Sequence, residues 1–164
     1  MAFDTYILFP GGEIKGEATG LKDALEIFSF SFGASNPVTI GTASAGASAG
    51  KVSISSFNIM KKTDSSSADL FLACCQGQHY KAMDVHIRKA TGTAGQKDFI
   101  TYKFGTVFIE SIQWSGSSGG DDTPTESVSF AFGQVAITYM KQDAKGALSA
   151  AGDVSWDVTK AANK

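Results

Sequence analysis

The residues that could carry chemistry are few and lie far apart in the sequence. His79 and His86 are the only histidines, and with Tyr80, Asp84 and Cys75 they could be drawn as a metal or acid/base cluster. The chain has no His-x-x-x-His or Cys-x-x-Cys pair, the spacings from which a zinc site is normally recognised. We therefore interpret His79 as a hydrogen-bonding residue, and we expect no catalytic residue, metal ion or cofactor.

A second candidate is the stretch Gly46-Ala47-Ser48-Ala49-Gly50-Lys51-Val52, since glycines before a lysine can expose backbone N–H groups to phosphate. The Walker motif has four residues between its glycines and a Ser or Thr after the lysine. Here three residues intervene and Val52 follows, so a flexible loop is the better interpretation. Asp121 and Asp122 lack the alternating oxygen ligands of an EF-hand and indicate a solvated turn.

The cysteines and the N-terminal segment bear on where the chain folds. Cys74 and Cys75 are adjacent, a spacing at which a disulfide is rare and strained, so we expect reduced thiols that serve in packing. Asp4 lies where a signal peptide needs positive charge, so no classical secretion signal is expected. The apolar run 70–75 is much shorter than the roughly 20 residues of a membrane helix, so membrane insertion is not expected either.

Length and charge limit the class of protein. A chain of 164 residues, 43% of them hydrophobic, suits a single domain that buries a core without disulfide or metal staples. The 14 Lys and Arg residues against 16 Asp and Glu give a formal charge of −2, and no basic run is present. Phosphate contacts need clustered cations, so nucleic acid and anionic membranes are not expected partners.

Alternation of apolar and polar residues predicts that the fold is mainly β. In 27–33, Phe28, Phe30 and Phe32 would share one face of a strand, opposite Ser29 and Ser31. Similar alternation predicts strands at 52–59 and 127–139. Further strands are expected at 4–9, 13–18, 83–89, 98–104, 107–114 and 154–159. Turn signals at such short spacing are typical of a barrel or a sandwich.

One helix is expected at 65–76, where Asp64 or Ser65 can cap the first turn and Gly77 can stop the last. Its apolar side chains would pack on the sheet; they are Leu70, Phe71, Leu72 and Cys74. Two stretches rich in Gly and Ser, 33–50 and 115–126, are expected to be loops. Loops of that length in a compact domain are usually functional or ordered by a partner.

The predicted strands pair a bulky face with a face of serine and alanine that is nearly free of charge. Ordinary solvent faces carry Lys and Glu, so this surface favours contact with other molecules, for example the wall of a pore or a subunit contact. Sheet edges without charged residues also favour pairing with another copy of the chain. A homo-oligomer is therefore one hypothesis, and a single ligand-binding barrel remains another.

Several segments together resemble the haemolysin-coregulated protein (Hcp) family, the inner-tube subunit of the bacterial type VI secretion system. The most specific are His79-Tyr80 and Ile87-Arg88-Lys89-Ala90, which follow the predicted helix at the family's separation. Others, in chain order, are Met1-Ala2-Phe3-Asp4, Lys15-Gly16-Glu17, Phe30-Ser31-Phe32-Gly33, Ala49-Gly50-Lys51-Val52, Asp121-Asp122, Glu126-Ser127-Val128 and Phe132-Gly133-Gln134-Val135. This chain departs from the family in having Phe where a tryptophan is frequent and Thr91-Gly92 where Gly-Gly is common.

The resemblance implies a single tube domain over 1–164, a small β-barrel of two packed antiparallel sheets with one flanking helix at about 65–76. Such subunits form homohexameric rings that stack into a tube, assemble in the bacterial cytoplasm with a contractile sheath and a VgrG-like spike, and are exported with effector proteins. By alternation, the lumen wall would carry Ser29, Ser31, Ser53, Ser55, Ser127 and Ser129. The extended loop at about 33–50 would reach a neighbouring copy through Thr39, Ile40, Thr42, Ser44, Ser48 and Lys51.

Two other functions compete with this structural, non-enzymatic role. A monomeric β-barrel that binds a small ligand would need a cavity lined by the phenylalanine face, and those side chains are bulky enough to fill a small barrel. An enzyme is a third reading, and no acid/base or metal constellation favours it.

Overall fold

The computed structural model describes residues 3–41, 46, 48–90, 95–120 and 122–163. The elements of this part are β1 (Asp4–Leu8), β2 (Leu25–Ile27), β3 (Ser29–Ser31), β4 (Ala34–Ser35), β5 (Val38–Thr39), β6 (Ser48–Ala49), β7 (Ser53–Ile54), β8 (Phe57–Lys62), α1 (Ser67–Gln76), β9 (His79–Ala90), β10 (Gln96–Ser115), β11 (Thr125–Gln142), β12 (Leu148–Asp157) and β13 (Ala162–Asn163). The mainly β class with one helix is therefore confirmed. No helix in the described residues is long and apolar enough to cross a membrane.

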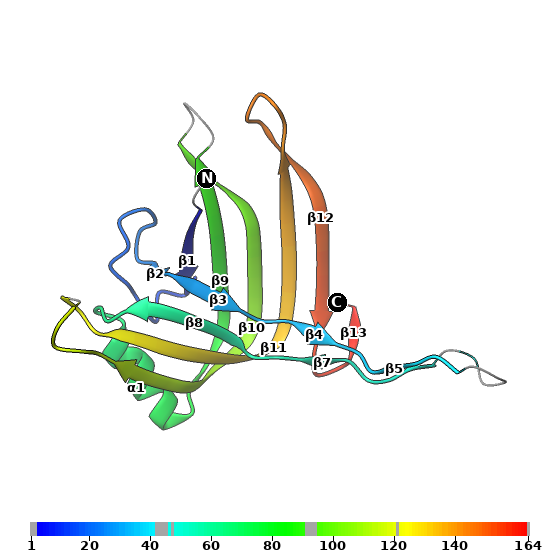
Figure 1. Cartoon of the computed structure of the whole chain (residues 1–164), viewed down its shortest axis with the longest axis horizontal. Coiled ribbons are helices and arrows are strands. Elements are labelled where there is room, and N and C mark those ends of the chain that lie inside the picture. The colour runs from blue at the N-terminus through cyan, green and yellow to red at the C-terminus, as the bar shows by residue number, and fades with distance from the viewer. Residues whose placement is uncertain (1–2, 42–45, 47, 91–94, 121, 164) are drawn as a thin grey trace.

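An antiparallel barrel forms the body of the molecule (Figure 1). Around the barrel, β1 pairs with β9, β9 with β10, β10 with β11, β11 with β8 and β8 with β3. β3 follows β2 after the single residue Phe28, and β2 pairs with β1. The chain itself thus closes the barrel at the corner between β2 and β3.

Strand β11 belongs to two pairings along its length. Its first part, from Thr125 to Phe130, pairs with β8, whereas its second part, from Gln134 to Gln142, pairs with β12. β13 pairs with the end of β12. Strands β9 to β12 therefore continue beyond the barrel as an open sheet, which rises above it in Figure 1.

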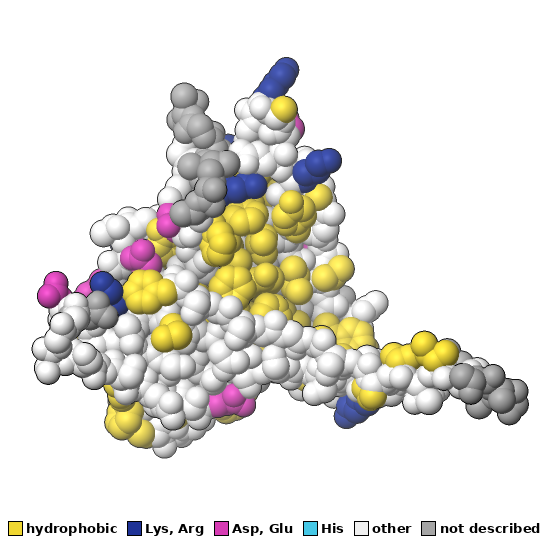
Figure 2. All heavy atoms as spheres, viewed as in Figure 1, with side chains coloured by type: hydrophobic (Ala, Val, Ile, Leu, Met, Phe, Trp, Pro, Cys, Tyr) yellow, Lys and Arg dark blue, Asp and Glu magenta, His cyan; other side chains and the backbone are white. Residues whose placement is uncertain are grey.

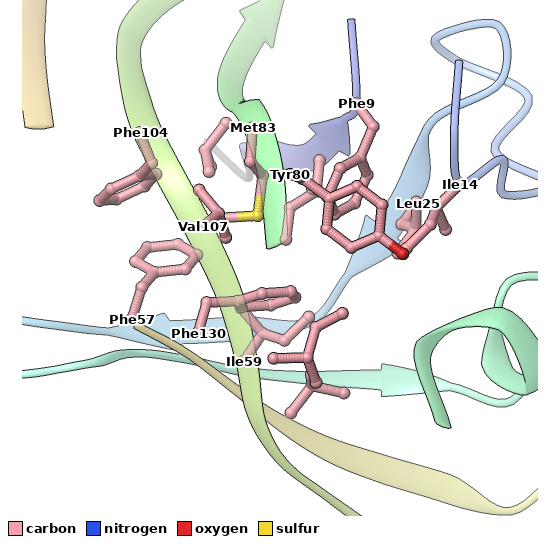
Figure 3. Close-up of a cluster of buried hydrophobic side chains, with 14 of the residues drawn as sticks. Phe9, Ile14, Leu25, Phe57, Ile59, Tyr80, Met83, Phe104, Val107 and Phe130 are labelled. Carbon is pink, nitrogen blue, oxygen red and sulfur yellow. The ribbon is translucent and has the colours of Figure 1, made fainter. Parts of the chain in front are cut away.

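Aromatic side chains fill the inside of the barrel (Figure 3). Phe57, Phe104 and Phe130 are at most 1% exposed, and the rings of Phe57 and Phe104 lie 4.9 Å apart. Met83 and Val107 pack beside them, both fully buried. The interior is a packed core, as expected for a barrel of this size.

The expectation that Phe28 shares the core face with Phe30 and Phe32 is wrong. Phe28 is 56% exposed, while the other two pack against the core. The N–H of Phe28 donates to the Met60 carbonyl at 2.8 Å, and Ser29 pairs with the same Met60. Two residues opposite one form a β-bulge, which turns the Phe28 ring outward and changes the alternation.

Three other expectations about strands need correction. Residues 13–18 form no strand, because backbone hydrogen bonds such as Gly16 N–H to Asp23 O (3.1 Å) fold this segment into a loop. The strands expected at 98–104 and 107–114 are one strand, β10, since β9 and β11 pair with it on both sides of Gly105. The strand expected at 154–159 begins earlier, at Leu148, and ends at Asp157.

Helix α1 lies close to the range that was expected. It ends at Gly77, whose left-handed backbone (φ 62°) suits glycine, and the Asp64 carboxylate accepts the Ser66 N–H at 2.9 Å before its first turn. Leu70 is fully buried on the barrel. Phe71 and Leu72 were expected to pack there too, but they are 48% and 52% exposed because they lie on the outer face of the helix.

A buried ionic network joins α1 to the barrel. The side chains of Lys61 and Glu126 are fully buried, and Lys61 Nζ lies 2.6 Å from Glu126 Oε1. Lys61 also contacts Asp64 Oδ1 at 2.8 Å, and the Ser67 hydroxyl donates to Glu126 Oε1 at 2.9 Å. The network therefore connects β8, β11 and the start of α1, and buried charges of this kind require such partners.

Candidate functional site

Four of the six serines predicted to form one surface lie together on the outer face of the barrel. The register places Ser29 and Ser127 on either side of Met60, and Ser31 and Ser129 on either side of Asn58. The rows continue onto β10 through Gln113 and Ser111. We call this face, carried by β3, β8, β11 and β10, the serine surface; its residues are Ser29, Ser31, Asn58, Met60, Ser111, Gln113, Ser127 and Ser129.

The eight residues of the serine surface are uncharged, and Glu110 borders them, where its carboxylate accepts the Ser56 hydroxyl at 2.5 Å. The Ser129 hydroxyl donates to Asn58 Oδ1, and the side chains of Ser29, Ser31 and Ser127 are exposed. Met60 is 45% exposed, and Phe28 lies beside it at the end of the surface, where Lys62 Nζ is 5.9 Å from its ring centroid. The sequence search missed the β8 and β10 members of the rows, because alternation does not reveal which strands are neighbours.

Ser53 and Ser55 lie apart from these rows, at the base of the chain segment that projects from the barrel. Ser53 pairs with Ser35 in the short ladder between β4 and β7. The Ser55 hydroxyl accepts the Gly33 N–H at 2.8 Å, so this side chain joins the two chain segments at the base of the projection. These two serines therefore hold the backbone where the segment leaves the barrel, and they are not part of the serine surface.

The stretch expected as a loop at 33–50 is a narrow two-stranded ribbon, which we call the arm (Figure 1). β4 pairs with β7 and β5 with β6, so the arm continues the β3–β8 hairpin away from the barrel. Of the predicted contact residues, Thr39, Ile40, Ser48 and Lys51 are exposed on it, and Thr42 and Ser44 lie outside the described residues. Ile40 is 77% exposed and Val38 is 59% exposed, so the arm offers apolar contacts that its own chain does not cover.

An apolar groove lies where the arm leaves the body, between β3, β4 and the open sheet. Phe32, Tyr102, Ile137 and Trp156 line it, and its volume is about 650 Å³. The rings of Phe32 and Tyr102 meet edge to face at 5.1 Å. Figure 2 shows a wide area of apolar side chains across the open sheet above the arm. Patches of this kind on a folded chain normally mark an interaction site.

The histidines do not meet in one site. His86 Nδ1 lies 2.8 Å from Asp98 Oδ2, and Asp98 Oδ1 lies 3.0 Å from Arg88 Nε, on the face of the sheet opposite the core. His79 instead contacts Phe108, with ring centroids 5.5 Å apart and the ring planes tilted by 34°. Within the described residues, no three His, Cys, Asp or Glu side chains come together as metal ligands would.

Two stretches have the Gly-x-Ser-x-Gly spacing of a nucleophile elbow, a match that the sequence search overlooked. They are 46–50 and 116–120. Ser48 lies on β6 of the arm and Ser118 in the turn between β10 and β11. Neither serine precedes a helix, which the elbow geometry requires. The spacing therefore carries no catalytic meaning here.

Comparison with known proteins identifies the family. The family model described as "Type VI secretion system effector, Hcp" matches residues 6–139. A solved type six secretion system protein is 32% identical, with a TM-score of 0.90 over 99% of this chain and 100% of that one. Hcp1 from Salmonella typhimurium has a TM-score of 0.78 at 23% identity, each chain being covered completely.

Among curated proteins, "Protein hcp1" of Pseudomonas aeruginosa is 36% identical over 97 residues, a match that spans 59% of each chain. The fold and the sequence thus agree on a type VI secretion protein. The chain belongs to the Hcp family.

Proposed function

We propose that this chain is the inner-tube subunit of a type VI secretion system. Copies form hexameric rings that stack into a tube, and the serine surfaces line its lumen. The tube assembles in the bacterial cytoplasm with a contractile sheath and a VgrG-like spike, carries effector proteins inside and is exported with them. Family membership supports the secretion system, and the uncharged serine surface supports the lumen.

The observation that carries the proposal is the position of the serine surface between two strand edges. In the described part, β3 pairs with β8 alone, and beyond Phe108 strand β10 pairs with β11 alone. One edge of the β3–β8–β11–β10 face is thus on β3 and the other on β10. Strand edges without partners favour pairing with another chain, and a repeated head-to-tail contact closes into a ring when the rotation allows.

The packed interior disfavours the alternative of a monomeric barrel that holds a small ligand. Phe57, Phe104 and Phe130 fill the space that such a ligand would need. The role is also non-enzymatic in this proposal, since lining a lumen needs shape and neutrality rather than reactive groups.

Light scattering on a sizing column, with negative-stain images of the peak, tests the proposal directly. Protein at several concentrations should contain a hexamer that appears as open rings. A monomer at every concentration, even after chemical crosslinking, would overturn the proposal and favour a ligand-binding barrel.

A further inference from the structure

A carboxylate lies at the border of the serine surface because of a β-bulge in β10. The register of β10 with β11 shifts between Ile109 and Ser111, so Glu110 is an additional residue between two paired positions. Bulges of this kind re-aim a side chain. Ile109 is 5% exposed and belongs to the core, whereas Glu110 and Ser111 are both exposed. The bulge therefore places Glu110 beside Ser111 on the outer face of the barrel.

The hydroxyl of Ser56 fixes this carboxylate against the barrel wall. Ser56 precedes Phe57, which is fully buried, so alternation puts the Ser56 side chain on the outer face. Its hydroxyl donates to Glu110 Oε2 at 2.5 Å, and within the described residues no donor bonds to Oε1. A pocket of about 140 Å³ lies beside the pair. Its other lining residues are Ile54, Ser55, Ala131, Phe132 and Val158.

Glu110 has no cation of its own chain to neutralise it. Among the described residues, none of the ion pairs includes this carboxylate. A second charged side chain, Lys62, borders the opposite end of the serine surface, where it is paired with Thr125. Lys62 shares its pocket with three carboxylates, those of Glu17, Glu26 and Asp64. The charge that remains uncompensated along this face is therefore negative.

The proposed ring would multiply this charge. Each copy would bring one Glu110 carboxylate to the lumen, at the same height and between neutral serine walls. Walls of low dielectric focus the potential of such charges into the space that they enclose. Rings of acidic side chains make a pore favour cations in the same way.

We propose that the lumen binds cargo proteins through a basic segment, and that Glu110 is the residue that determines this preference. The inference rests on the proposed tube and deepens it by naming the chemistry of the cargo. A lysine or arginine side chain suits the pocket beside Ser56, since its methylene stem can lie on Ile54 and Phe132 while its cation reaches Glu110. An acidic segment would meet a like charge from every copy and would be repelled.

Removal of the charge alone tests this role. Glu110→Gln keeps the shape of the side chain and an oxygen for the Ser56 hydroxyl, so the fold and the rings should persist. Two fluorescent peptides, one of serine and lysine and one of serine and glutamate, are the probes, and fluorescence anisotropy measures their binding to rings. Wild-type rings should bind the lysine peptide at least about tenfold more tightly, because the contact repeats around the ring. In Glu110→Gln the two affinities should lie within about twofold of each other.

A matched control removes a carboxylate elsewhere. Asp153 is exposed on β12 and accepts the Thr138 hydroxyl, so Asp153→Asn makes the same change of charge away from the serine surface and should keep the full preference. Ser111→Lys neutralises Glu110 without replacing it and should abolish the preference, which keeps the inference testable if Glu110→Gln forms no rings. Added salt should weaken the wild-type preference, since it screens exposed charges.

The outcomes separate this inference from the proposed function. Wild-type rings that bind both peptides equally, or a preference that Glu110→Gln leaves unchanged, would overturn the cargo preference and leave the tube role intact. A wild-type protein that stays monomeric even after crosslinking would overturn both. Loss of the preference in Glu110→Gln and in Ser111→Lys, with the full preference in Asp153→Asn, would establish the role of Glu110.

Discussion

Lys61 and Glu126 form an ion pair of 2.6 Å with both side chains fully removed from solvent. Glu126 Oε2 is buried and has no hydrogen-bond partner among the described residues, so Lys61 is the group that neutralises this carboxylate. Met60 and Ser127, their chain neighbours, belong to the serine surface. The pair therefore lies directly behind the face that we assign to the lumen.

Removing the cation should be far more damaging than replacing the pair. Lys61→Met should destabilise the fold by about 3–5 kcal/mol, because an uncompensated carboxylate would stay buried. Adding Glu126→Leu should recover most of that loss, as judged from urea unfolding midpoints. Lys62→Met, next in the chain and exposed, should change stability by less than about 0.5 kcal/mol. Equal losses in the single and the double variant would contradict this account.

The bulge at Phe28 predicts a large contrast between this phenylalanine and Phe57 of β8. Phe57→Ala should cost about 3–5 kcal/mol, because it opens a cavity in the core. Phe28→Ala should cost less than about 1 kcal/mol, since the ring is already 56% exposed. Chemical unfolding of the two variants measures the difference. Comparable losses of unfolding free energy would indicate that Phe28 packs in the core.

A bulky cation on the serine surface should block cargo without preventing assembly. In Ser31→Arg the new side chain would project from the β3 end of the rows, and ring formation should persist. Retention of a cargo protein that binds wild-type rings should be lost when the two are expressed together. Ser149→Arg, at an exposed position on β12, is the control and should retain cargo. Full retention in Ser31→Arg would argue against the lumen assignment.

The arm should matter for assembly and little for folding. Val38→Ser with Ile40→Ser removes two side chains that are 59% and 77% exposed, so the unfolding free energy should change by less than about 0.5 kcal/mol. Stacking or ring closure should weaken, as seen by light scattering and electron microscopy. Shortening the arm between residues 43 and 49 should have the same effect. Normal tubes from either variant would contradict a role for the arm.

The ionisation of Asp157 makes the stability of the fold depend on pH in the acid range. A hydrogen bond from the Thr159 hydroxyl at 2.5 Å, aided by the N–H groups of Lys160 and Thr159, holds the pKa of the Asp157 carboxyl below its usual value. Its contribution to stability is thus present above the pKa of the unfolded chain, about 3.9, and is lost as the pH falls through the lower folded value. Asp157→Asn should be less stable than the wild type at neutral pH.

That difference should shrink below about pH 4, where protonation removes the charge from the wild type as well. Urea unfolding midpoints of the two proteins at neutral and acidic pH provide the measurement. A gap that is the same at both pH values would show that the charge of Asp157 contributes nothing.

Alternation predicted the β class and placed Ser29, Ser31, Ser127 and Ser129 on outward faces, because side-chain direction follows from period two alone. It could not show that Met60 and Asn58 lie between them, since pairing and register depend on strands far apart in the sequence. The helix range was nearly right because its capping and stop residues are local signals. The prediction that Phe71 and Leu72 pack on the barrel was wrong, because it rested on their apolar character and not on the face of the helix that they occupy.

Other features are invisible to periodicity. Lys61 is a charged residue at an inward position, and only its three-dimensional partners on β11 and α1 make burial tolerable. The bulge at Phe28 adds one residue to a strand without any glycine or proline to mark it. The groove at Trp156 joins Phe32 with residues from β4, β7, β10, β11 and β12, so no single segment could reveal it.

The double pairing of β11 sets an order of events during synthesis of the chain. β3, β8 and the arm leave the ribosome long before β11, yet β8 reaches its second neighbour only when residues 125–130 have been made. Until then the β3–β8 hairpin is a two-stranded ribbon, which is marginally stable by itself. Until residues 125–130 have been made, β8 therefore presents an unpaired edge, and unpaired strand edges make incomplete chains prone to pair wrongly with one another.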